Sequence, residues 1–254
     1  MHKLRLISRL DIKAPYLVKG RQFEGLRKIG DPNSFAIKYY EEGIDEIFYE
    51  DIVASLYERN SLLEIINKTA ENIFVPLTVG GGLRNLNDVE NVLKFGADKV
   101  AINTAAIKNP EFISQVSDKF GSQCMVLSIQ AKKQEKNWEA FYDNGREKSG
   151  LDVVEWAVKG EKNGAGEIIL TSVDNDGMAN GFDVELVQAI TKEVSIPVIV
   201  SGGMGKLSDV SDIIKTANVD AVAIARSLHY NNFTIKEIKD HCKSEKILAR
   251  NLTS

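Results

Sequence analysis

The sequence has few cysteines and no long apolar run, and each shortage excludes a class of protein. Only Cys124 and Cys242 occur, and no spacing of Cys and His reads as a metal motif, so we expect no disulfide framework and no bound metal. No segment is apolar for long enough to span a membrane, and no signal peptide is present. These absences predict a cytoplasmic protein with no membrane partner.

An excess of basic residues is also lacking. Lys and Arg number 32 against 36 Asp and Glu, which gives a formal net charge of −4. A protein dedicated to nucleic acids needs concentrated Lys and Arg to neutralise phosphates, so this balance argues against a nucleic-acid partner. No linker rich in Pro, Gly or Ser divides the chain, and we expect a single domain over residues 1–254.

The main positive feature is an internal repeat. An apolar run that ends in glycines, Val75-Pro-Leu-Thr-Val-Gly-Gly-Gly82, recurs as Ile196-Pro-Val-Ile-Val-Ser-Gly-Gly203, and the matched residues lie 121 positions apart. The same offset relates Glu46 to Glu167. The repeat predicts two copies of a half-chain unit.

Strand patterns alternate with helix patterns along the whole chain. Strands are expected at residues 4–11, 46–51, 75–79, 99–104, 124–129, 167–171, 197–200 and 220–225. Helices are expected at 34–42, 59–69, 87–95, after 110, at 153–163, 184–192 and 210–217, and from 235. Eight such units favour an α/β fold, a (β/α)8 TIM barrel built from two duplicated half-barrels, with its site on the loops that follow the strands.

Two segments interrupt this alternation. Residues 13–31 show no sustained periodicity and are expected to form a long mobile loop, which we interpret as an active-site lid. Residues 132–149 are polar, with aromatic residues around Asp143-Asn-Gly145, and this pattern predicts a hairpin inserted on a loop.

Glycines that directly follow a short buried strand let backbone N–H groups approach an anion closely, and the next helix adds its positive end. Gly81 and Gly82 hold such a position in the first half, and Gly202 and Gly203 in the second. Two turns of this kind predict two phosphate sites. The alternative is that each Gly-Gly pair only makes a tight strand-to-helix turn.

From residue 4 to residue 229 the sequence resembles the cyclase subunit of imidazole glycerol phosphate synthase. The motifs that carry the resemblance are Leu10-Asp11, Val18-Lys-Gly20, Gly30-Asp-Pro32, Gly43-Ile-Asp-Glu46, Val79-Gly-Gly-Gly82, Ala97-Asp-Lys99, Ile102-Asn-Thr104, Phe120-Gly-Ser-Gln123, Gly164-Ala-Gly-Glu167 and Ser201-Gly-Gly203. The resemblance implies a phosphorylated small-molecule substrate, no cofactor, and ammonia supplied by a separate glutaminase subunit in a heterodimer.

Asp11 matches the family's catalytic base, and a carboxylate there can accept a proton during addition to a carbonyl or an imine. Lys19 matches the lysine of the family's loop and could neutralise phosphate. The resemblance places phosphate groups at Gly81, Gly82, Asn103 and Thr104, and at Asp176, Gly177, Gly202 and Gly203. Helix capping is the alternative role for Asn103 and Thr104.

Four charged residues match the family's gate to an ammonia path: Arg5, Glu46, Lys99 and Glu167. Each begins an expected strand, so the four should meet at the amino end of the barrel. Buried charges are costly unless they are paired, and two cations balance two anions here. A purely structural ring of salt bridges is the alternative.

The sequence departs from the family at the second catalytic carboxylate, whose position is held by Gln130. An amide cannot donate and recover a proton as a carboxyl group does, and losing a general acid typically costs about 10²–10⁴-fold in rate. Arg9 and Glu50 are also unusual, and both are expected to face inward and to pair. Arg226, near the second glycine turn, could bind an added phosphate or carboxylate in a bidentate manner.

Three hypotheses follow. The first is the histidine-pathway cyclase itself, a lyase-type enzyme, with a site weakened by Gln130. The second is a paralogue that delivers ammonia to another acceptor, such as a nucleotide-linked sugar in surface polysaccharide synthesis, because Leu10-Asp-Ile-Lys13 and Val53-Ala-Ser-Leu56 resemble chains of that kind. The third is a non-catalytic barrel that activates a glutaminase.

Overall fold

The computed structural model describes residues 3–53 and 62–250, and its centre is a closed parallel barrel. The barrel strands are β1 (Arg5–Lys13), β4 (Glu46–Asp51), β5 (Leu77–Gly80), β6 (Lys99–Ile102), β7 (Met125–Lys133), β10 (Glu167–Ser172), β11 (Val198–Ser201) and β12 (Ala221–Ile224). Each pairs in parallel with the next, and β12 returns to β1. The predicted (β/α)8 barrel is confirmed.

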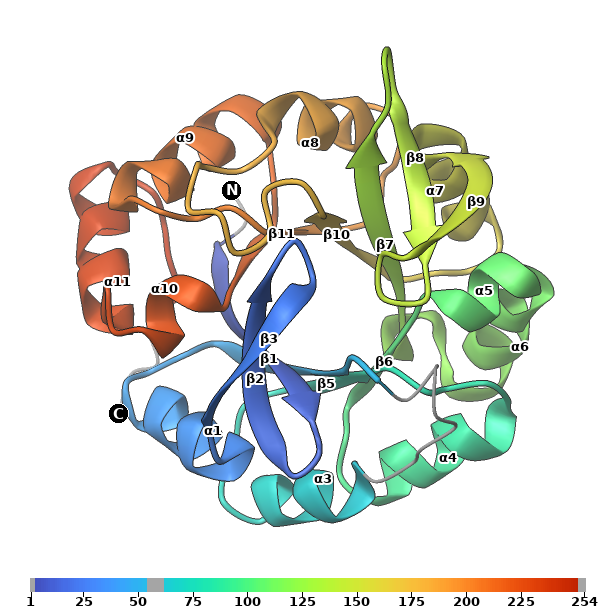
Figure 1. Ribbon diagram of the computed structural model, residues 1–254, viewed down its shortest axis with the longest axis horizontal. Coiled ribbons are helices and arrows are strands. Elements are labelled where there is room, and N and C mark those ends of the chain that lie inside the picture. Colours follow the sequence, from blue (N-terminus) through green and yellow to red (C-terminus); the bar gives the residue numbers. More distant parts are fainter. Residues whose placement is uncertain (1–2, 54–61, 251–254) are drawn as a thin grey trace.

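Helices surround the barrel in a ring (Figure 1). They are α1 (Pro32–Glu41), α3 (Leu63–Ala70), α4 (Leu86–Lys94), α5 (Thr104–Lys108), α6 (Glu111–Phe120), α7 (Val153–Lys162), α8 (Val184–Thr191), α9 (Leu207–Ala217), α10 (Arg226–His229) and α11 (Ile235–Ser244), with a 3₁₀ turn η1 (Ser122–Cys124). Within the described residues, none of these helices is long and apolar enough to cross a membrane.

Side-chain caps set several helix starts. Asp31 accepts a hydrogen bond from the N–H of Ser34 at the start of α1, and Asp152 does the same for Val154 and Glu155 at α7. The helix expected at 59–69 corresponds to α3; residues 59–61 of that expectation lie outside the described residues, as does most of the motif at 53–56. The short helices α5 and α10 were missed, because four or five residues carry too little periodicity.

The two halves of the chain repeat in space as in sequence. β10 begins 121 residues after β4, and β11 begins 121 residues after β5. Each half therefore contributes four consecutive barrel strands and one glycine turn, and the two glycine turns occupy equivalent places at the carboxyl ends of β5 and β11.

The expectation of a long loop without regular structure at residues 13–31 is wrong, whereas its interpretation as a lid stays a prediction. The segment forms an antiparallel hairpin of β2 (Tyr16–Arg21) and β3 (Glu24–Gly30), which extends β1 and crosses the carboxyl-end mouth of the barrel (Figure 1). Its turn places Gln22 and Phe23 at φ values of 51° and 64°. Hairpin turns with positive φ are usually signalled by Asn or Gly, so this sequence gave no warning of one.

The hairpin expected at 132–149 is present as part of a three-stranded meander. β7 runs on past the barrel and pairs with β8 (Trp138–Tyr142), which pairs with β9 (Glu147–Asp152). Asp143, Asn144 and Gly145 make the turn between β8 and β9, all at positive φ. The phenyl ring of Phe23 lies against Gly145, so the two hairpins meet over the barrel mouth.

Strand residues alternate between two apolar cores. Leu6 and Leu10 face outward into the large core under the helices, whereas Ile7 and Phe48 face inward with Val126, Ile169, Ile199 and three alanines. This inner cluster fills the middle of the barrel. Charged side chains lie inside the barrel at both of its ends, as the two-residue period of β1 predicts.

The inner cluster gives a test of the packing. Phe48→Ala should lower the free energy of unfolding by about 3–5 kcal/mol, because the helices cannot collapse into a cavity inside the barrel. Phe74→Ala is the matched control, since that ring is 81% exposed, and its effect should stay within about 0.5 kcal/mol. Urea unfolding of both variants measures the difference, and equal losses would contradict this account of the core.

Candidate functional site

Four charged side chains form a closed ring at the amino end of the barrel. Arg5 binds Glu46 (Nη1 to Oε1, 2.8 Å) and Glu167, while Lys99 binds Glu46 at 3.2 Å and Glu167 at 3.0 Å. Each residue is the first of its barrel strand, and the parallel strands bring these positions together. We call this set the charged ring.

The ring is shielded but not sealed. Glu46 and Glu167 are buried, whereas the Arg5 and Lys99 side chains keep 16% and 19% of their surface exposed. Burial opposes the charged form of Arg5, but Glu167 and then Glu46 outweigh it and raise the pKa of the guanidinium. Arg5 and Glu167 also line a cavity of about 340 Å³ that opens at this end of the barrel.

A second charged cluster lies at the carboxyl end, beneath the hairpin of β2 and β3. Lys19 Nζ donates to Asp11 Oδ2 at 2.7 Å and to both oxygens of Asp176, at 3.0 and 2.9 Å. Arg9 Nε donates to Asp11 Oδ1 at 2.8 Å. All four side chains are nearly inaccessible to solvent. We call this set the mouth cluster.

The cations of the mouth cluster fix the protonation state of Asp11. Burial alone would favour the neutral acid, but Arg9 and then Lys19 hold the pKa of Asp11 well below its usual range. Burial likewise opposes the charge on Lys19, and Asp11 and Asp176 raise its pKa instead. Asp11 is therefore a carboxylate at neutral pH.

The expected pairing of Arg9 with Glu50 is wrong. Besides Asp11, the Arg9 guanidinium donates through Nη1 to Thr171 at 2.9 Å and to Ser201 at 3.3 Å. Its remaining surface lies near the rings of Phe23 and Phe48. These contacts direct the guanidinium toward β10 and β11, so Glu50 forms no ion pair among the described residues, although it feels the charge of Arg9.

The first glycine turn opens onto a cavity of about 720 Å³, which we call the main cavity. Its lining includes all four residues predicted for the first phosphate site, Gly81, Gly82, Asn103 and Thr104, and also Glu50 and Gln130. Gly81 has φ of +89°, and a Cβ there would lie 2.1 Å from the carbonyl oxygen of Asp51, so no other residue fits.

Within the described residues, side chains around the main cavity leave polar atoms without partners. Asn103 donates to the carbonyl of Phe141 at 3.1 Å, but its Oδ1 accepts no hydrogen bond from any described residue. The capping role is not seen, since Asn103 makes no side-chain hydrogen bond to α5. Gln130 Oε1 and both amide atoms of Asn144 are also buried without a partner in residues 3–53 and 62–250. Such atoms carry a desolvation cost that a polar ligand in the cavity would remove.

The second glycine turn is closed. Asp176, Gly177, Gly202, Gly203 and Arg226 all line one cavity, but it measures only about 20 Å³, which is room for roughly one water molecule. The hairpin covers it: Gln22 N–H donates to the carbonyl of Asp176 at 2.8 Å, and Lys19 forms part of the lining. A phosphate group can enter this turn only if the hairpin moves away.

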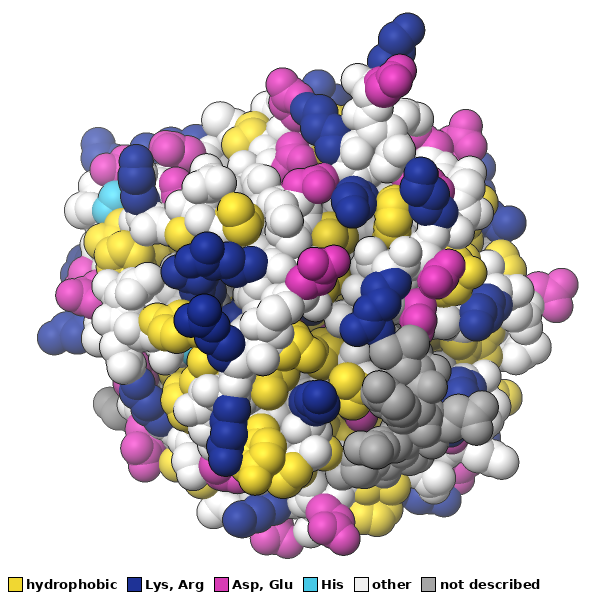
Figure 2. Space-filling model, in the orientation of Figure 1, with side chains coloured by type: hydrophobic (Ala, Val, Ile, Leu, Met, Phe, Trp, Pro, Cys, Tyr) yellow, Lys and Arg dark blue, Asp and Glu magenta, His cyan; other side chains and the backbone are white. Residues whose placement is uncertain are grey.

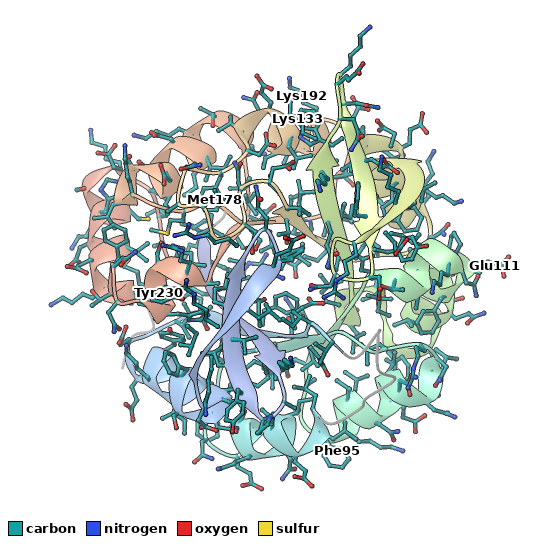
Figure 3. The ribbon with its side chains drawn as sticks, viewed as in Figure 1. Phe95, Glu111, Lys133, Met178, Lys192 and Tyr230 are labelled. Carbon is teal, nitrogen blue, oxygen red and sulfur yellow. The ribbon has the colours of Figure 1, made fainter. Side chains whose placement is uncertain are left out.

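Arg226 begins α10 beside the closed turn. Its guanidinium lies 5.3 Å from the ring of Tyr230, and Figure 3 shows Tyr230 at the outer end of α10, with Met178 near the hairpin on the loop after β10. Arg226 Nε is buried and has no partner among the residues that the structure describes. On the face that carries the hairpins, basic and acidic side chains are interspersed (Figure 2).

Sequence reasoning missed several residues of the site. Thr171 and Ser201 could have been found from strand parity, since each lies on the inward side of a barrel strand at or next to its carboxyl end. Asn144 had a signal in the Asn-Gly turn, but nothing placed that turn against the cavity. Phe23 had none, because the hairpin itself was not foreseen.

No group of three His, Cys, Asp or Glu that could hold a metal occurs in the described part of the chain.

Glu50 gives a test of these electrostatics. Burial, opposed by Arg9 and reinforced by Asp11 and Asp51, raises the pKa of Glu50 from 4.5 to about 7. The folded protein thus holds this proton more tightly than the unfolded chain does. The carboxyl costs no folding free energy below pH 4.5, and it costs progressively more as the pH rises through 7.

Glu50→Gln should therefore change the free energy of unfolding more favourably at pH 8 than at pH 4.5. The difference between the two changes should reach up to about 3 kcal/mol, since one pKa unit corresponds to about 1.4 kcal/mol. Urea unfolding of both proteins across this range measures the difference. Glu155→Gln, on the exposed surface of α7, should show no such trend. A difference that does not change with pH would contradict the raised pKa.

Comparison with known proteins agrees with this geometry. The family model described as "Histidine biosynthesis protein" matches residues 5–234. The chain is 60% identical over 210 residues to the imidazole glycerol phosphate synthase subunit HisF of Legionella pneumophila, covering 82% of this chain and 99% of that protein.

Two further relatives carry the same name. The HisF subunit of Lactococcus lactis is 47% identical over 248 residues, which cover 97% of this chain and 96% of that protein. The HisF subunit of Clostridium botulinum is 44% identical over 248 residues, which cover 97% of this chain and 98% of that protein. On this similarity over most of its length, the chain belongs to the HisF family of imidazole glycerol phosphate synthase subunits.

Proposed function

We propose that this chain is the cyclase subunit of an imidazole glycerol phosphate synthase, a lyase-type enzyme that receives ammonia and closes an imidazole ring on a phosphorylated substrate. The observation that carries the proposal is the arrangement of charge in one barrel. The charged ring lies at the amino end and the mouth cluster at the carboxyl end, and the inner cluster of apolar side chains lies between them.

Asp11 is the base in this proposal. Its carboxylate is held ionised by Arg9 and Lys19, and it lies on the inward side of β1 near the end of the strand, where TIM-barrel enzymes place reacting groups. Lys19 reaches it from a hairpin that must move before phosphate can enter the second turn. Hairpin movement would therefore exchange the Lys19 contact with Asp176 for a contact with phosphate.

The two glycine turns would hold the phosphate groups of the substrate. The first is open and is lined by Asn103 and Thr104, and α4 begins shortly after it. The second is lined by Gly177, Gly202 and Gly203, and Arg226 lies beside it as an added cation. Backbone N–H groups at such turns bind anions well.

A separate glutaminase subunit would supply the ammonia at the charged ring. The ring closes the amino end of the barrel with two cations and two anions, each of which bonds to both of its neighbours of opposite charge. A salt bridge that is only structural has no need of the adjoining cavity, whereas a path for a small molecule does. Breaking one pair would open the ring.

The relatives favour the cyclase over the two other hypotheses, because all those compared carry the HisF name. Delivery of ammonia to a different acceptor is not favoured, and neither is a barrel without activity. The mouth cluster agrees with this, since a merely activating partner has no use for a carboxylate held ionised among buried cations.

Asp11→Asn tests the activity. With ammonium salts and the substrate of imidazole glycerol phosphate synthase, turnover by the purified chain should fall about 10²–10⁴-fold, as expected for loss of a general base. Asp240→Asn, an exposed change of the same kind on α11, should retain full turnover. Thermal unfolding checks that both variants fold. Full activity in Asp11→Asn would remove Asp11 as the base.

Lys99→Ala tests the partner. Co-expression with the organism's glutaminase should yield a stable complex, and in that complex the variant should lose the link between glutamine hydrolysis and product formation. Turnover with ammonium salts should fall much less. Lys119→Ala, which breaks an exposed ion pair with Glu90, is the control. If no glutaminase binds, or if both variants couple normally, the ammonia path does not run through the ring.

A further inference from the structure

Gln130 puts an amide where the proposed cyclase would need a second carboxyl group on β7, yet two carboxyl side chains, Glu50 and Asp51, line the main cavity. Glu50 lies near the carboxyl end of β4 on the inward face, is 7% exposed, and lines the same cavity as Gln130. Because Arg9 turns toward Thr171 and Ser201, no ion pair holds the Glu50 carboxyl among the described residues.

The barrel strands next to Glu50 carry small residues on their inward face. Glu50 is level with Gly80 on β5, and Gly80 is level with Ala101 on β6. The Glu50 carboxyl occupies the space that a side chain at position 80 would fill, since a Cβ there would lie 2.8 Å from Oε2. Gly80 and Ala101 therefore leave Glu50 an open path into the main cavity.

The rest of the cavity wall is prepared for polar ligand atoms. Gln130, Asn103 and Asn144 each carry a buried amide atom that has no partner in the described part of the chain, and all three line the main cavity together with Glu50 and the first glycine turn. These amides can bind and orient a substrate, but they cannot give up a proton at neutral pH.

We propose that Glu50 is the second catalytic carboxyl of this chain, taking from β4 the proton-transfer role that Gln130 cannot perform on β7. The inference rests on the proposed function and adds a residue to it. Gln130 then becomes a hydrogen-bonding residue that positions the substrate.

The step is a proton relay. Condensation of an amine with a carbonyl forms a C–N bond and releases the carbonyl oxygen as water. Both hydrogen atoms of that water come from the amine nitrogen. The Glu50 carboxyl donates a proton to the departing hydroxyl group, the C–O bond breaks, and water leaves. The Glu50 carboxylate then takes the remaining proton from the nitrogen, so the carboxyl group is restored and no other reactant is needed.

The surroundings of Glu50 suit this role. Burial is the largest influence and raises the pKa of Glu50 to about 7, with Asp11 and Asp51 adding to it and Arg9 opposing it. A general acid is most effective when its pKa lies near the working pH. The other carboxyls nearby are engaged: Asp176 and Asp11 bind Lys19, and Asp51 accepts from the N–H of Val53.

The test compares wild type, Glu50→Gln, and Glu50→Gln combined with Gln130→Asp, using ammonium salts and the substrate of imidazole glycerol phosphate synthase. Glu50→Gln should lower kcat about 10²–10⁴-fold with little change in KM. Adding Gln130→Asp to this variant should raise its kcat again by at least about tenfold. Wild-type kcat should fall as the pH rises through about 7, and that limb should be absent in Glu50→Gln. Glu155→Gln should match wild type.

Rescue by Gln130→Asp separates catalysis from structure, because a variant that had merely misfolded would not recover when a second residue is changed. Wild-type turnover that is unchanged in Glu50→Gln overturns the inference and leaves the proposed cyclase standing. Loss without rescue, and with the pH limb intact, also overturns it. Absence of turnover in wild type, with folded protein, overturns both the inference and the cyclase function.

Discussion

The arrangement of side chains at the carboxyl end of the barrel depends on the contacts between the carboxylate of Asp11 and the two buried cations Arg9 and Lys19. Arg9 and Lys19 would be very costly inside a barrel without anions, and Asp11 and Asp176 supply them at hydrogen-bonding distance. The hairpin of β2 and β3 is tied down by this same contact, since Lys19 is its inward-facing residue. The charge balance therefore couples the state of the base to the position of the hairpin and to access to the second glycine turn.

The two ends of the barrel use charge differently. At the amino end, each member of the charged ring bonds to two neighbours, and the cations remain partly exposed, so water can reach them when one pair separates while the second pair holds. At the carboxyl end the charges are almost fully buried, and removing one leaves its partners unpaired. The first arrangement suits transient passage, and the second suits a fixed protonation state.

Sequence reasoning found the barrel because its signal is repeated: eight apolar strands, each followed by a helix, with the glycine turns 121 residues apart. Two-residue periodicity also placed Arg5, Arg9, Glu46 and Glu50 on inward faces. It could not choose between partners for Arg9, because Asp11, Thr171, Ser201 and Glu50 all point inward, and the distances among them depend on how the strands stagger. The hairpin over the mouth was lost for a local reason, since Gln22 and Phe23 take a turn conformation that neither residue type signals.

The position of Arg9 also explains how two carboxyl groups in neighbouring strands can differ. Asp11 and Glu50 are level with each other in the pairing of β1 with β4, and both are buried. The guanidinium bonds to Asp11 and not to Glu50, so burial is overcome at the first carboxyl and prevails at the second. Asp11 is held ionised, whereas the pKa of Glu50 is raised to about 7, and acid and base roles within a single site require pKa values separated in this way. In the proposed mechanism Arg9 holds the base Asp11 ionised, and because its guanidinium does not bond to Glu50, that carboxyl is left to act as the acid, so the two residues are best understood as one arrangement.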